Sequence, residues 1–530
     1  MMLTGEDRHP FEGMDVASLL RQRARHRPDH PFIIWVPNEG HVQSISYAAF
    51  EYRVRRIAGG LIRRGVGPGD RVLIHLDNCP EALTSWYACI WLGAVPVTTN
   101  ARAAGAELSY FAAHSQAVGG ITQPRFATLV ADHCRDLRWL AVTDHDNGDE
   151  VDVARRPSGD DRFDALDGEP AAPRVADPLA ACSVQYTSGT TSRPKGVLWT
   201  HANALWGARI NAAHETLRAD DRHLVHLPLF HTNAQAYSVL ACLWVGATAV
   251  IVPRFSASRF WPVSIAHQCT WTSLIPFCVK ALMTQDLPAT HSYRLWGSAV
   301  ESPPSDAHFG IPTMGWWGMT ETITHGIVSD PALPGVPMSI GRPAPEYGIA
   351  IVDDDSVPVR DARPVEPGES GCLMIRGIRG LSLFREYLDD PVATEQSFDP
   401  QGWFRTGDRV ELLESGAIRF GDRSKDMLKV GGENVAASEI ERVVATVPGV
   451  RECAVVAGRD PMLDEVPVLF IRVDDRAPAD LEQQIMRTCE QELARFKWPR
   501  EIRRVNDFPR STLEKIAKAQ LRRQLAGDAD

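Results

Sequence analysis

Short apolar runs alternate with helical patterns through the first two thirds of the chain. Residues 71–76 (RVLIHL) have the pattern of a buried strand, residues 80–92 that of a helix beginning with proline, and residues 95–98 that of a second strand. Gly93 separates this helix from the second strand. A strand, a helix and a strand in this order are typical of a βαβ unit, so their repetition predicts mainly parallel sheets covered by helices. The buried-strand pattern recurs at residues 224–228, 247–252 and 271–275.

The pattern changes near Gly341 to short apolar runs separated by dense turn signals. The segments YGIAIVDDDSVPV and GESGCLMIRG are examples, and they predict an antiparallel, barrel-like unit over about residues 341–420. The acidic run at residues 353–355 is predicted to be a hairpin turn rather than a cation site.

A third pattern begins near Arg423 and continues to the end of the chain. Ser438 and Glu441 have the spacing of a helix capping box. Apolar residues at helical spacing follow at Ile440, Val443, Val444 and Val447. Strands are predicted at residues 453–457, 468–473 and 501–505, and a helix at residues 481–496.

These patterns predict an α/β protein with a large N-terminal domain and a small C-terminal domain. The N-terminal domain, residues 1–422, would contain two helix-covered sheets and the small β-barrel. The C-terminal domain, residues 423–530, is of α+β character and long enough to fold as a small domain.

Composition and charge are those of an ordinary globular protein. Hydrophobic residues make up 44% of the chain and charged residues 23%. The net charge of −11 argues against nucleic acid or an anionic membrane as the main partner, because both attract a basic surface. The most apolar segment, residues 238–253, is interrupted by Gly246 and Thr248, so it predicts a helix, a turn and a strand rather than a membrane span.

Ten cysteines are scattered along the chain without a C-x-x-C pair or a Cys/His cluster. A chain of this length does not need disulfides for stability, so reduced thiols in the cytoplasm are expected and no structural zinc is implied. The first residues, MMLTGEDRHPFEG, lack the basic and apolar segments of a secretory signal.

Lysine is rare in this chain, with seven lysines against 49 arginines. Lysine carries a compact ammonium on a flexible stem, which suits contact with a phosphate or a reacting oxygen, whereas arginine presents a planar fork. Lys195 lies in TSGTTSRPKG and Lys515 in PRSTLEKIAK, and we interpret both as functional. Lys280 and Lys518 are interpreted as lysines kept by chance.

A loop rich in hydroxyl groups follows the short strand predicted at residues 183–186. The loop contains Thr187, Ser188, Gly189, Thr190 and Thr191, and it ends with Pro194, Lys195 and Gly196. Hydroxyls, backbone amides and a mobile ammonium in one loop favour a nucleotide phosphate. It is not a Walker A loop, because a strand rather than a helix follows the lysine.

This loop and several later motifs resemble the adenylate-forming superfamily, which includes acyl-CoA synthetases, peptide-synthetase adenylation domains and firefly-type luciferases. The similarity extends over nearly the whole chain, and PLFHTNAQ, FSASRFW, GMTET and KVGGENV resemble carnitine/crotonobetaine-CoA ligase-like enzymes most. The resemblance implies an ATP- and Mg²⁺-dependent acyl-CoA synthetase. Such an enzyme converts a carboxylic acid to acyl-AMP with release of pyrophosphate, then transfers the acyl group to the CoA thiol with release of AMP.

The resemblance also implies roles in the motif GWWGMTET, where Trp317 takes the place of the aromatic residue beside adenine. Most relatives carry tyrosine at this position. Gly318 leaves room for the nucleotide, and Thr320 contacts the α-phosphate or the substrate carboxylate. Glu321 binds magnesium, which prefers oxygen ligands and few protein carboxylates. Further contacts to ATP or AMP are implied for the loop residues Thr187 to Thr191, for Lys195 and for Gly297, Ser298, Ala299, Trp316, Asp408 and Arg423.

Lys515 matches the superfamily lysine that spans the attacking carboxylate and the α-phosphate, where a cation offsets the repulsion between two anions. Glu514 stands where relatives commonly have glycine, and it either points to solvent or pairs with Lys515. Lys425 matches the hinge about which the small, mobile C-terminal domain turns. Rotation would withdraw Lys515 and form the CoA tunnel from Gly431, Gly432, Glu433 and Asn434.

The acyl pocket is expected to follow the strand at residues 224–228. His231 is either a gate between this pocket and the thiol tunnel or a structural histidine, and Asn233 either binds substrate or caps a helix. The candidate pocket residues are His231, Asn233, Ala234, Tyr237, Ser298 and Trp316. Small residues beside two tryptophans indicate a bulky, ring-containing or polar-substituted acid.

Three other functions remain as alternatives. An enzyme of the same fold could load the acyl group onto the phosphopantetheine of a carrier protein. Luciferase-like oxygenation is disfavoured because the chain lacks a peroxisomal-type C-terminal tripeptide, and a non-catalytic binding protein is disfavoured by Lys195, Glu321, Asp408 and Lys515. The expected partners are a small carboxylic acid, ATP and CoA, with no nucleic acid, and the expected location is the cytoplasm.

Overall fold

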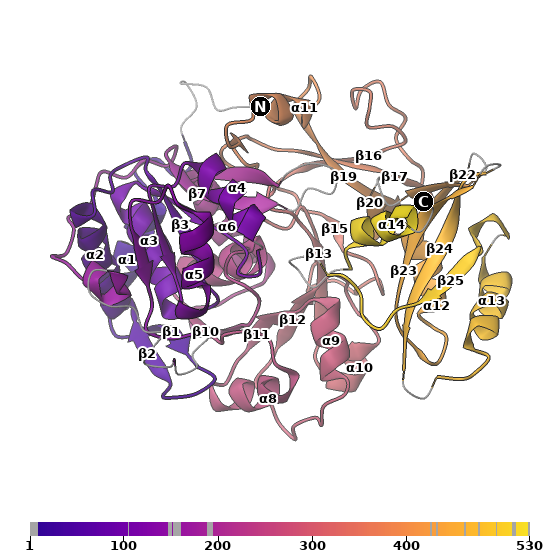
Figure 1. Cartoon of the computed structure of the whole chain (residues 1–530), viewed down its shortest axis with the longest axis horizontal. Coiled ribbons are helices and arrows are strands. Elements are labelled where there is room, and N and C mark those ends of the chain that lie inside the picture. The colour runs from indigo at the N-terminus through magenta and orange to yellow at the C-terminus, as the bar shows by residue number, and fades with distance from the viewer. Residues whose placement is uncertain are drawn as a thin grey trace. The chain divides into compact units, whose positions relative to one another are not determined.

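The computed structural model of the chain describes residues 9–103, 105–146, 151, 161–187, 194–423, 427–430, 433–460, 463–474, 477–493, 495–510 and 516–527. The chain divides into two compact units (Figure 1). The first unit comprises Met1–Gly189, Arg193–Gly348 and Arg376–Gly402. The second unit comprises Thr190–Ser192, Ile349–Ile375 and Trp403–Asp530.

The first unit contains a seven-stranded sheet whose five consecutive strands β7-β4-β3-β5-β6 are parallel. Strands β8 and β18 extend its other edge in antiparallel orientation. In spatial order the strands are β18 (Glu386–Tyr387), β8 (Lys195–Thr200), β7 (Ala181–Thr187), β4 (Val95–Thr98), β3 (Arg71–His75), β5 (Gly119–Thr122) and β6 (Leu140–Val142). The predicted βαβ arrangement is therefore confirmed.

A nine-stranded sheet completes the framework of the first unit. Its central strands β13-β12-β11-β9-β10-β1 are parallel, and its edges are antiparallel. In spatial order the strands are β15 (Arg342–Pro343), β14 (Ile327–Val328), β13 (Thr313–Trp317), β12 (Leu295–Ser298), β11 (Trp271–Ser273), β9 (Arg222–Val225), β10 (Thr248–Ile251), β1 (Pro31–Trp35) and β2 (Gln43–Ser46).

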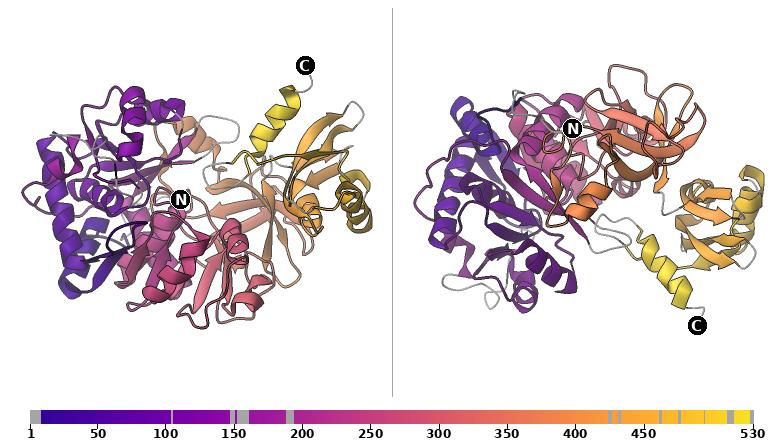
Figure 2. Two further views of the ribbon diagram at one scale, coloured as in Figure 1. Left: turned by 60° about the horizontal axis from the view of Figure 1, so that its bottom comes forward. Right: turned by 90° about the horizontal axis from the view of Figure 1, so that it is seen from above.

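Helices surround these sheets in both views of Figure 2. They are α1 (Val16–His26), α2 (Tyr47–Arg63), α3 (Pro80–Leu92), α4 (Gly105–Ser115), α5 (Pro124–His133), η3 (Phe163–Leu166), α6 (His201–His214), η4 (Asn233–Leu240), α7 (Ala241–Val245), α8 (Ala257–Ala266), α9 (Pro276–Leu282), α10 (Ser305–Phe309) and α11 (Pro391–Gln396). Helix η4 is a π-helix that continues directly into α7.

Helix α3 has the bounds that the sequence predicts. Pro80 begins the helix, where a missing N–H costs no hydrogen bond, and Gly93 ends it in the left-handed region with φ +81°. Every residue from Pro80 to Trp91 is buried, which fits a helix that is apolar on all sides.

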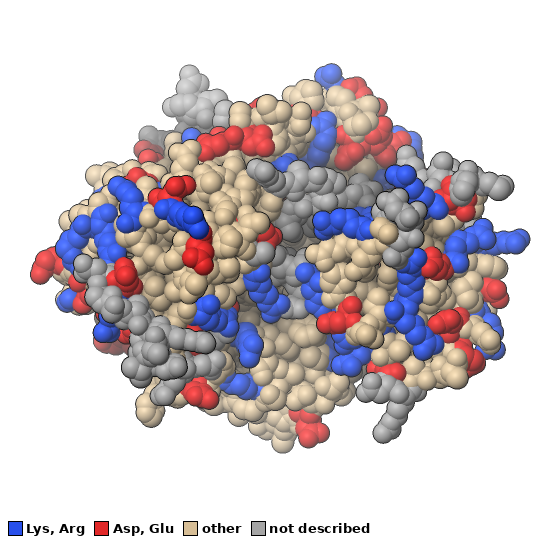
Figure 3. Space-filling model, viewed as in Figure 1, with Lys and Arg blue, Asp and Glu red and all other residues tan. Residues whose placement is uncertain are grey.

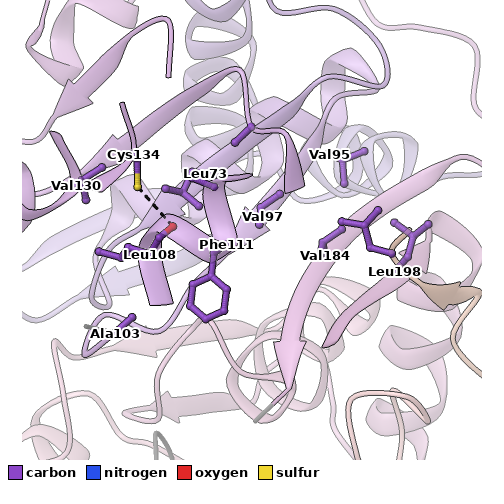
Figure 4. Packing of buried hydrophobic residues seen from close by; sticks show 13 residues of the cluster. Leu73, Val95, Val97, Ala103, Leu108, Phe111, Val130, Cys134, Val184 and Leu198 are labelled. Atoms are coloured by element: carbon purple, nitrogen blue, oxygen red, sulfur yellow. Dashed lines mark hydrogen bonds between the residues drawn. The ribbon is translucent and has the colours of Figure 1, made fainter. Parts of the chain in front are cut away.

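One hydrophobic core connects the seven-stranded sheet with α4 and α5 (Figure 4). Leu73, Val97 and Val184 lie on three neighbouring strands, and each is completely buried. Phe111 of α4 packs against this group, and its ring lies 4.4 Å from that of Tyr186 on β7. This packing fixes the end of β7, where the predicted phosphate loop begins.

The second unit contains a four-stranded sheet of β16 (Gly348–Val352), β17 (Ser370–Arg376), β19 (Trp403–Leu412) and β20 (Ile418–Arg423). The order β16-β17-β19-β20 leaves β16 and β20 as separate edges among the described residues. The barrel-like closure of this unit therefore stays a prediction. The acidic run lies in a turn, as predicted, where Asp354 accepts a hydrogen bond from the Ser356 amide (2.8 Å).

A second sheet in this unit has the order β22-β21-β24-β23, with β25 on the other side of β24. Its strands are β21 (Met427–Val430), β22 (Glu433–Ala436), β23 (Val450–Asp460), β24 (Asp464–Val473) and β25 (Glu501–Arg504), and its helices are α12 (Ala437–Val444), α13 (Leu481–Glu492), η6 (Arg495–Lys497) and α14 (Lys518–Gly527). Ile440 of α12 and Ile485 of α13 share one core with the sheet, whereas Leu521 of α14 belongs to another.

Two local predictions for this unit were wrong. Ser438 does not stand at the N-cap, because α12 begins one residue earlier, at Ala437, and the Ser438 hydroxyl donates to the Gly421 carbonyl oxygen (2.7 Å). The Glu441 carboxylate instead accepts from the Val455 amide (2.6 Å) and pairs with Lys518 (2.9 Å). The predicted helix 481–496 ends at Glu492, before the short η6.

Acidic and basic side chains both occur over the face drawn in Figure 3. Within the described part of the chain, no helix is both long and apolar enough to cross a membrane. All ten cysteines carry free thiols.

Candidate active site

The predicted phosphate loop joins two antiparallel strands of the seven-stranded sheet. Thr187 at the end of β7 pairs with Lys195 at the start of β8, and the Thr187 hydroxyl donates to the Lys195 carbonyl oxygen (3.4 Å). The Tyr110 hydroxyl donates to the carbonyl oxygen of Pro194 (2.9 Å), which ties the returning strand to α4. Ser188, Gly189, Thr190 and Thr191 lie outside the described residues.

Lys195 and Glu321 come from distant parts of the chain and contact the same side chain, Tyr387 of β18. The Tyr387 hydroxyl donates a 2.9 Å hydrogen bond to Oε1 of Glu321. The Lys195 ammonium nitrogen lies 4.5 Å from the centroid of the Tyr387 ring. Glu321 is only 4% exposed, so this carboxylate is held in a largely desolvated place. Neither motif in the sequence pointed to Tyr387.

Thr320 is fixed by contacts on both its backbone and its side chain. The Trp199 indole N–H donates to the Thr320 carbonyl oxygen (2.9 Å). The Thr232 hydroxyl lies 3.2 Å from the Thr320 hydroxyl and donates to Oε1 of Gln185 (2.8 Å). Strands β7 and β8, the start of η4 and the 319–322 turn therefore meet at Thr320.

The turn after this motif has a strained backbone at Ile323, whose φ is +65°. A β-branched residue rarely adopts this conformation, which costs of the order of 1–3 kcal/mol. The side-chain amide of Asn211 donates to the Ile323 carbonyl oxygen (3.2 Å), and the Ile323 side chain is completely buried. These contacts hold the turn that carries Thr320 and Glu321.

Gly297 and Ser298 lie on β12 beside β13, where they pair with Met314 and Gly315. A methyl group at Gly297 would overlap the indole of Trp316, so glycine is required for this close approach. Ser298 and Trp317 are buried, and Ala299, directly after β12, is exposed. A methyl group at Gly318 would overlap the Tyr237 hydroxyl.

Trp316 belongs to an aromatic cluster and is buried. Its indole stacks on the His325 ring (4.4 Å between centroids, 15° between planes) and on Trp271 (5.8 Å, 24°). The Tyr237 ring contacts both Trp316 (5.9 Å) and His325 (4.3 Å). Trp316 is thus a core residue whose indole also covers Gly297.

Glu215 forms a buried polar group with His223 and His325 next to this cluster, and the sequence patterns did not predict it. Oε1 of Glu215 is 3.9 Å from Nε2 of His325, and Oε2 of Glu215 is 3.9 Å from Nε2 of His223. Burial raises the pKa of the Glu215 carboxyl well above its usual range. Burial lowers the pKa of His325 well below its usual range and that of His223 to about 4. None of these residues lies in a recognisable sequence motif, so only the fold reveals that they are close together.

His231 and Asn233 stand at the start of η4. The His231 amide donates to the Pro228 carbonyl oxygen (3.0 Å), and its ring, half-buried, contacts Phe230 (4.5 Å between centroids). The N-cap of the helix is Thr232, without a side-chain capping bond, so Asn233 does not cap it. Ala234 is buried. A π-helix here is consistent with a functional position, since such turns are frequent at sites.

The remaining predicted residues belong to the second unit. Asp408 on β19 is 7% exposed, and its backbone pairs with Arg423 of β20. Its amide donates to the Thr406 hydroxyl (3.1 Å). Glu433 and Asn434 of β22 pair with Val430 and Lys429 of β21. Lys425, Gly431, Gly432, Glu514 and Lys515 lie outside the described residues.

Comparison with known proteins decides the family. The model of the AMP-binding enzyme family matches residues 20–388, and that of the AMP-binding enzyme C-terminal domain matches residues 439–515. The chain belongs to the AMP-binding enzyme family. It is 33% identical over 515 residues to the crotonobetaine/carnitine–CoA ligase of Salmonella typhi, covering 93% of this chain and 96% of that one. The ligase of the same name from Escherichia coli O139:H28 is 33% identical over 502 residues, covering 91% and 94%.

Solved structures of similar enzymes share the fold of this AMP-binding enzyme. The O-succinylbenzoate CoA synthetase of Bacillus subtilis, in complex with AMP, has a TM-score of 0.80 at 25% identity, covering 95% of this chain and 97% of that one. An ATP-bound protein from Rhodopseudomonas palustris, MatB, has a TM-score of 0.82 at 25% identity, covering 96% and 99%. The chain is thus an AMP-forming acid–thiol ligase that uses ATP and CoA.

The residues near Glu321 fit a magnesium ion bound to ATP. The buried carboxylate and the neighbouring Thr320 hydroxyl are oxygen donors, which a hard cation prefers. Among the described residues, no group of three or more His, Cys, Asp or Glu side chains could hold a metal by itself. Magnesium that is carried by nucleotide phosphates needs only one or two protein carboxylates, so a single glutamate is compatible with this role.

Proposed function

We propose that this AMP-binding enzyme forms the acyl-adenylate at the place where Lys195, Thr320 and Glu321 meet. The contact of Tyr387 with both Lys195 and Glu321 carries the proposal, because it brings a phosphate-binding cation and a magnesium-binding carboxylate into one site. An ammonium there stabilises negative charge on the phosphates as pyrophosphate leaves. Magnesium, when bound, neutralises further phosphate charge.

The other roles follow the family motifs residue by residue and support the same reaction. Trp317 and Gly318 would border the adenine with Gly297, Ser298 and Ala299, and Trp316 would form the wall between nucleotide and acid. Asp408 would accept hydrogen bonds from the ribose hydroxyls, and Arg423 would contact ribose or phosphate. The loop Thr187 to Thr191 would bind the phosphates with Lys195.

We propose that residues 423–530 turn about Lys425 between the two half-reactions. In the first, Lys515 spans the acid and the α-phosphate. In the second, Gly431, Gly432, Glu433 and Asn434 border the pantetheine arm beside His231. Lys515→Ala should therefore slow acyl-AMP formation at least about 100-fold, but change thioester formation from supplied acyl-AMP by less than about threefold. Equal losses in both steps would contradict the rotation.

We infer that the acid is compact and carries a polar or charged substituent. The indole of Trp316 occupies the space over Gly297, which favours a compact acid over a bulky one. Tyr237 and His325 next to it provide aromatic faces and polar atoms. The relatives named for crotonobetaine and carnitine make trimethylammonium acids the first candidates for this chain.

The test measures pyrophosphate release with a panel of aliphatic, aromatic, polycyclic and trimethylammonium-bearing acids. Short polar acids should give the highest kcat/KM, and AMP and the CoA thioester should form in equal amounts when CoA is present. A preference for long-chain or polycyclic acids would overturn the inference about the acid while leaving the reaction intact.

The same assay distinguishes CoA from a carrier protein. Thioester formation with free CoA as the sole thiol is expected, as in the relatives that are named CoA ligases. Transfer only to a phosphopantetheinylated carrier protein would establish the alternative. We also propose a cytoplasmic location, because the reaction consumes ATP and CoA.

A further inference from the structure

Tyr387 joins two parts of the active site that are far apart in the sequence. It lies on β18, the edge strand of the seven-stranded sheet, and pairs with Val197 of β8. The next amide, that of Leu388, donates to the Gly196 carbonyl oxygen (2.7 Å). The nearby Phe384 amide donates to the Glu321 carbonyl oxygen (2.8 Å). The segment from 384 to 388 is thus bonded to the strand of Lys195 and to the turn of Glu321.

The side chain of Tyr387 continues this connection. It is 5% exposed, its hydroxyl donates to Oε1 of Glu321 (2.9 Å), and its ring lies 4.5 Å from the Lys195 ammonium. The Tyr387 amide donates to the Thr394 hydroxyl (3.0 Å), and the Phe384 ring packs on the phenol (4.8 Å between centroids). These contacts leave the phenol little freedom to turn.

The two contacts suit the chemistry of their partners. The Tyr387 hydroxyl donates its hydrogen bond to the Glu321 carboxylate, and an ionised carboxylate can only accept. A donated hydrogen bond orients a buried carboxylate and offsets part of its desolvation cost. An aromatic face attracts an ammonium without cancelling its charge. Within the described residues Lys195 has no ion pair, so the ring positions a cation whose full charge can act on a phosphate.

We propose that Tyr387 is a positioning residue for the magnesium–nucleotide complex: its hydroxyl orients Glu321 while its ring positions Lys195. The separation between a metal-binding carboxylate and a phosphate-binding ammonium is then set by one rigid side chain. This inference rests on the proposed function and assigns Tyr387 a part in it that is separate from the chemistry of the acid.

Tyr387→Phe tests the hydroxyl, because it keeps the ring and removes only the bond to Glu321. The magnesium concentration for half-maximal pyrophosphate release should rise about tenfold, as expected for a lost hydrogen bond to a charged group. At saturating magnesium, kcat should stay within about threefold of wild type. Tyr387→Leu also removes the ring, so it should raise the KM for ATP in addition.

Calorimetry gives a second measurement that does not depend on turnover. The dissociation constant of ATP, titrated at a series of magnesium concentrations without acid, should increase in Tyr387→Phe mainly at low magnesium. Tyr47→Phe is the matched control, since Tyr47 is completely buried and its hydroxyl donates to the Ala247 carbonyl oxygen (2.7 Å). The control should leave both magnesium curves unchanged, and melting curves verify that each variant is folded.

Wild-type magnesium dependence in Tyr387→Phe, by both assays, would overturn the proposal. So would an equal loss of kcat at every magnesium concentration, which would indicate a merely structural role. Failure of the proposed acyl-adenylate formation would give a different result, because wild-type protein would then release no pyrophosphate with any acid.

Discussion

At the residue scale, the site depends on a few side chains that come from distant segments of the chain. Lys195, Thr320 and Glu321 each lie in a short motif whose residue types match phosphate and magnesium chemistry, and their roles stay predictions. Tyr387 and Glu215 could not be predicted, since each gains its importance from contacts between segments distant in the sequence. The same holds for Trp316, whose partners Trp271 and His325 are set by the fold.

Glu321→Gln should lower kcat/KM for ATP by about 10- to 100-fold, because the amide removes a charged oxygen ligand without changing the size of the side chain. The loss should lessen as magnesium increases, and pyrophosphate release across a magnesium series measures it. Glu81→Gln is a control in which a buried carboxylate paired with Arg53 and His145 is neutralised away from the site. A loss that is independent of magnesium would contradict the role of Glu321.

Glu215→Gln should remove a loss of stability that the wild-type protein shows as the pH rises. Burial raises the pKa of the Glu215 carboxyl, so the folded protein keeps a proton that the unfolded chain releases above its ordinary pKa of 4.5. Stability is therefore lost as the pH rises from 4.5 toward the folded pKa, by about 1.4 kcal/mol per pH unit. Melting temperatures at pH 6, 7 and 8 should diverge between the two proteins. A constant difference would show that Glu215 is ionised in the folded state.

At the scale of elements, the positions of Pro80 and Gly93 predicted both ends of helix α3. The ends of other helices are determined by tertiary contacts. The Ser438 side chain bonds to Gly421, and the Glu441 side chain bonds to Val455 and Lys518. These partners are distant in the sequence, so the local pattern could not predict them. The π-helix η4 could not be predicted either, since its apolar positions are those of an ordinary buried helix.

Helix α6 illustrates an element end that also supports the site. Thr200 and Asn203 form a capping box. The side-chain amide of Asn203 also donates to the carbonyl oxygens of Leu381 and Leu383 (both 2.8 Å). These bonds hold the segment that leads to Tyr387.

Asn203→Ala should destabilise the protein by about 2–3 kcal/mol, because it removes a cap contact and leaves two buried carbonyl groups with fewer donors. Ser46→Ala, at the exposed N-cap of α2, should cost about 1 kcal/mol or less. Chemical denaturation of both variants gives the comparison. Equal losses would show that the bonds to Leu381 and Leu383 contribute nothing.

At the scale of the whole molecule, the sequence predicted two sheet-and-helix layers and a small α+β portion, because alternating strand and helix patterns extend over long stretches. Closure of the four-stranded sheet depends on strand number and pairing, which local patterns do not report. The parallel sheets also bury many histidines without charge. Burial lowers the pKa of His75 and His223 to about 4 and that of His201 and His226 to about 3.

This set predicts marked acid sensitivity. Each histidine is neutral in the folded protein but gains a proton in the unfolded chain below its ordinary pKa of 6.5. The contribution of these histidines to stability is fully present above pH 6.5, and it is lost as the pH falls toward 4, by about 1.4 kcal/mol per pH unit for each histidine. His226→Phe should reduce the slope of melting temperature against pH between 6 and 4.5. An unchanged slope in the variant would contradict the assignment of His226 as a neutral buried group.

ATP–pyrophosphate exchange without CoA tests the central claim most directly, because only a reversible acyl-adenylate returns labelled pyrophosphate to ATP. With a suitable short polar acid, label should enter ATP in wild-type protein, require both acid and magnesium, and fall at least tenfold in Glu321→Gln. Absence of acid-dependent exchange across the whole panel, or exchange that is unaffected by Glu321→Gln at low magnesium, would contradict the account.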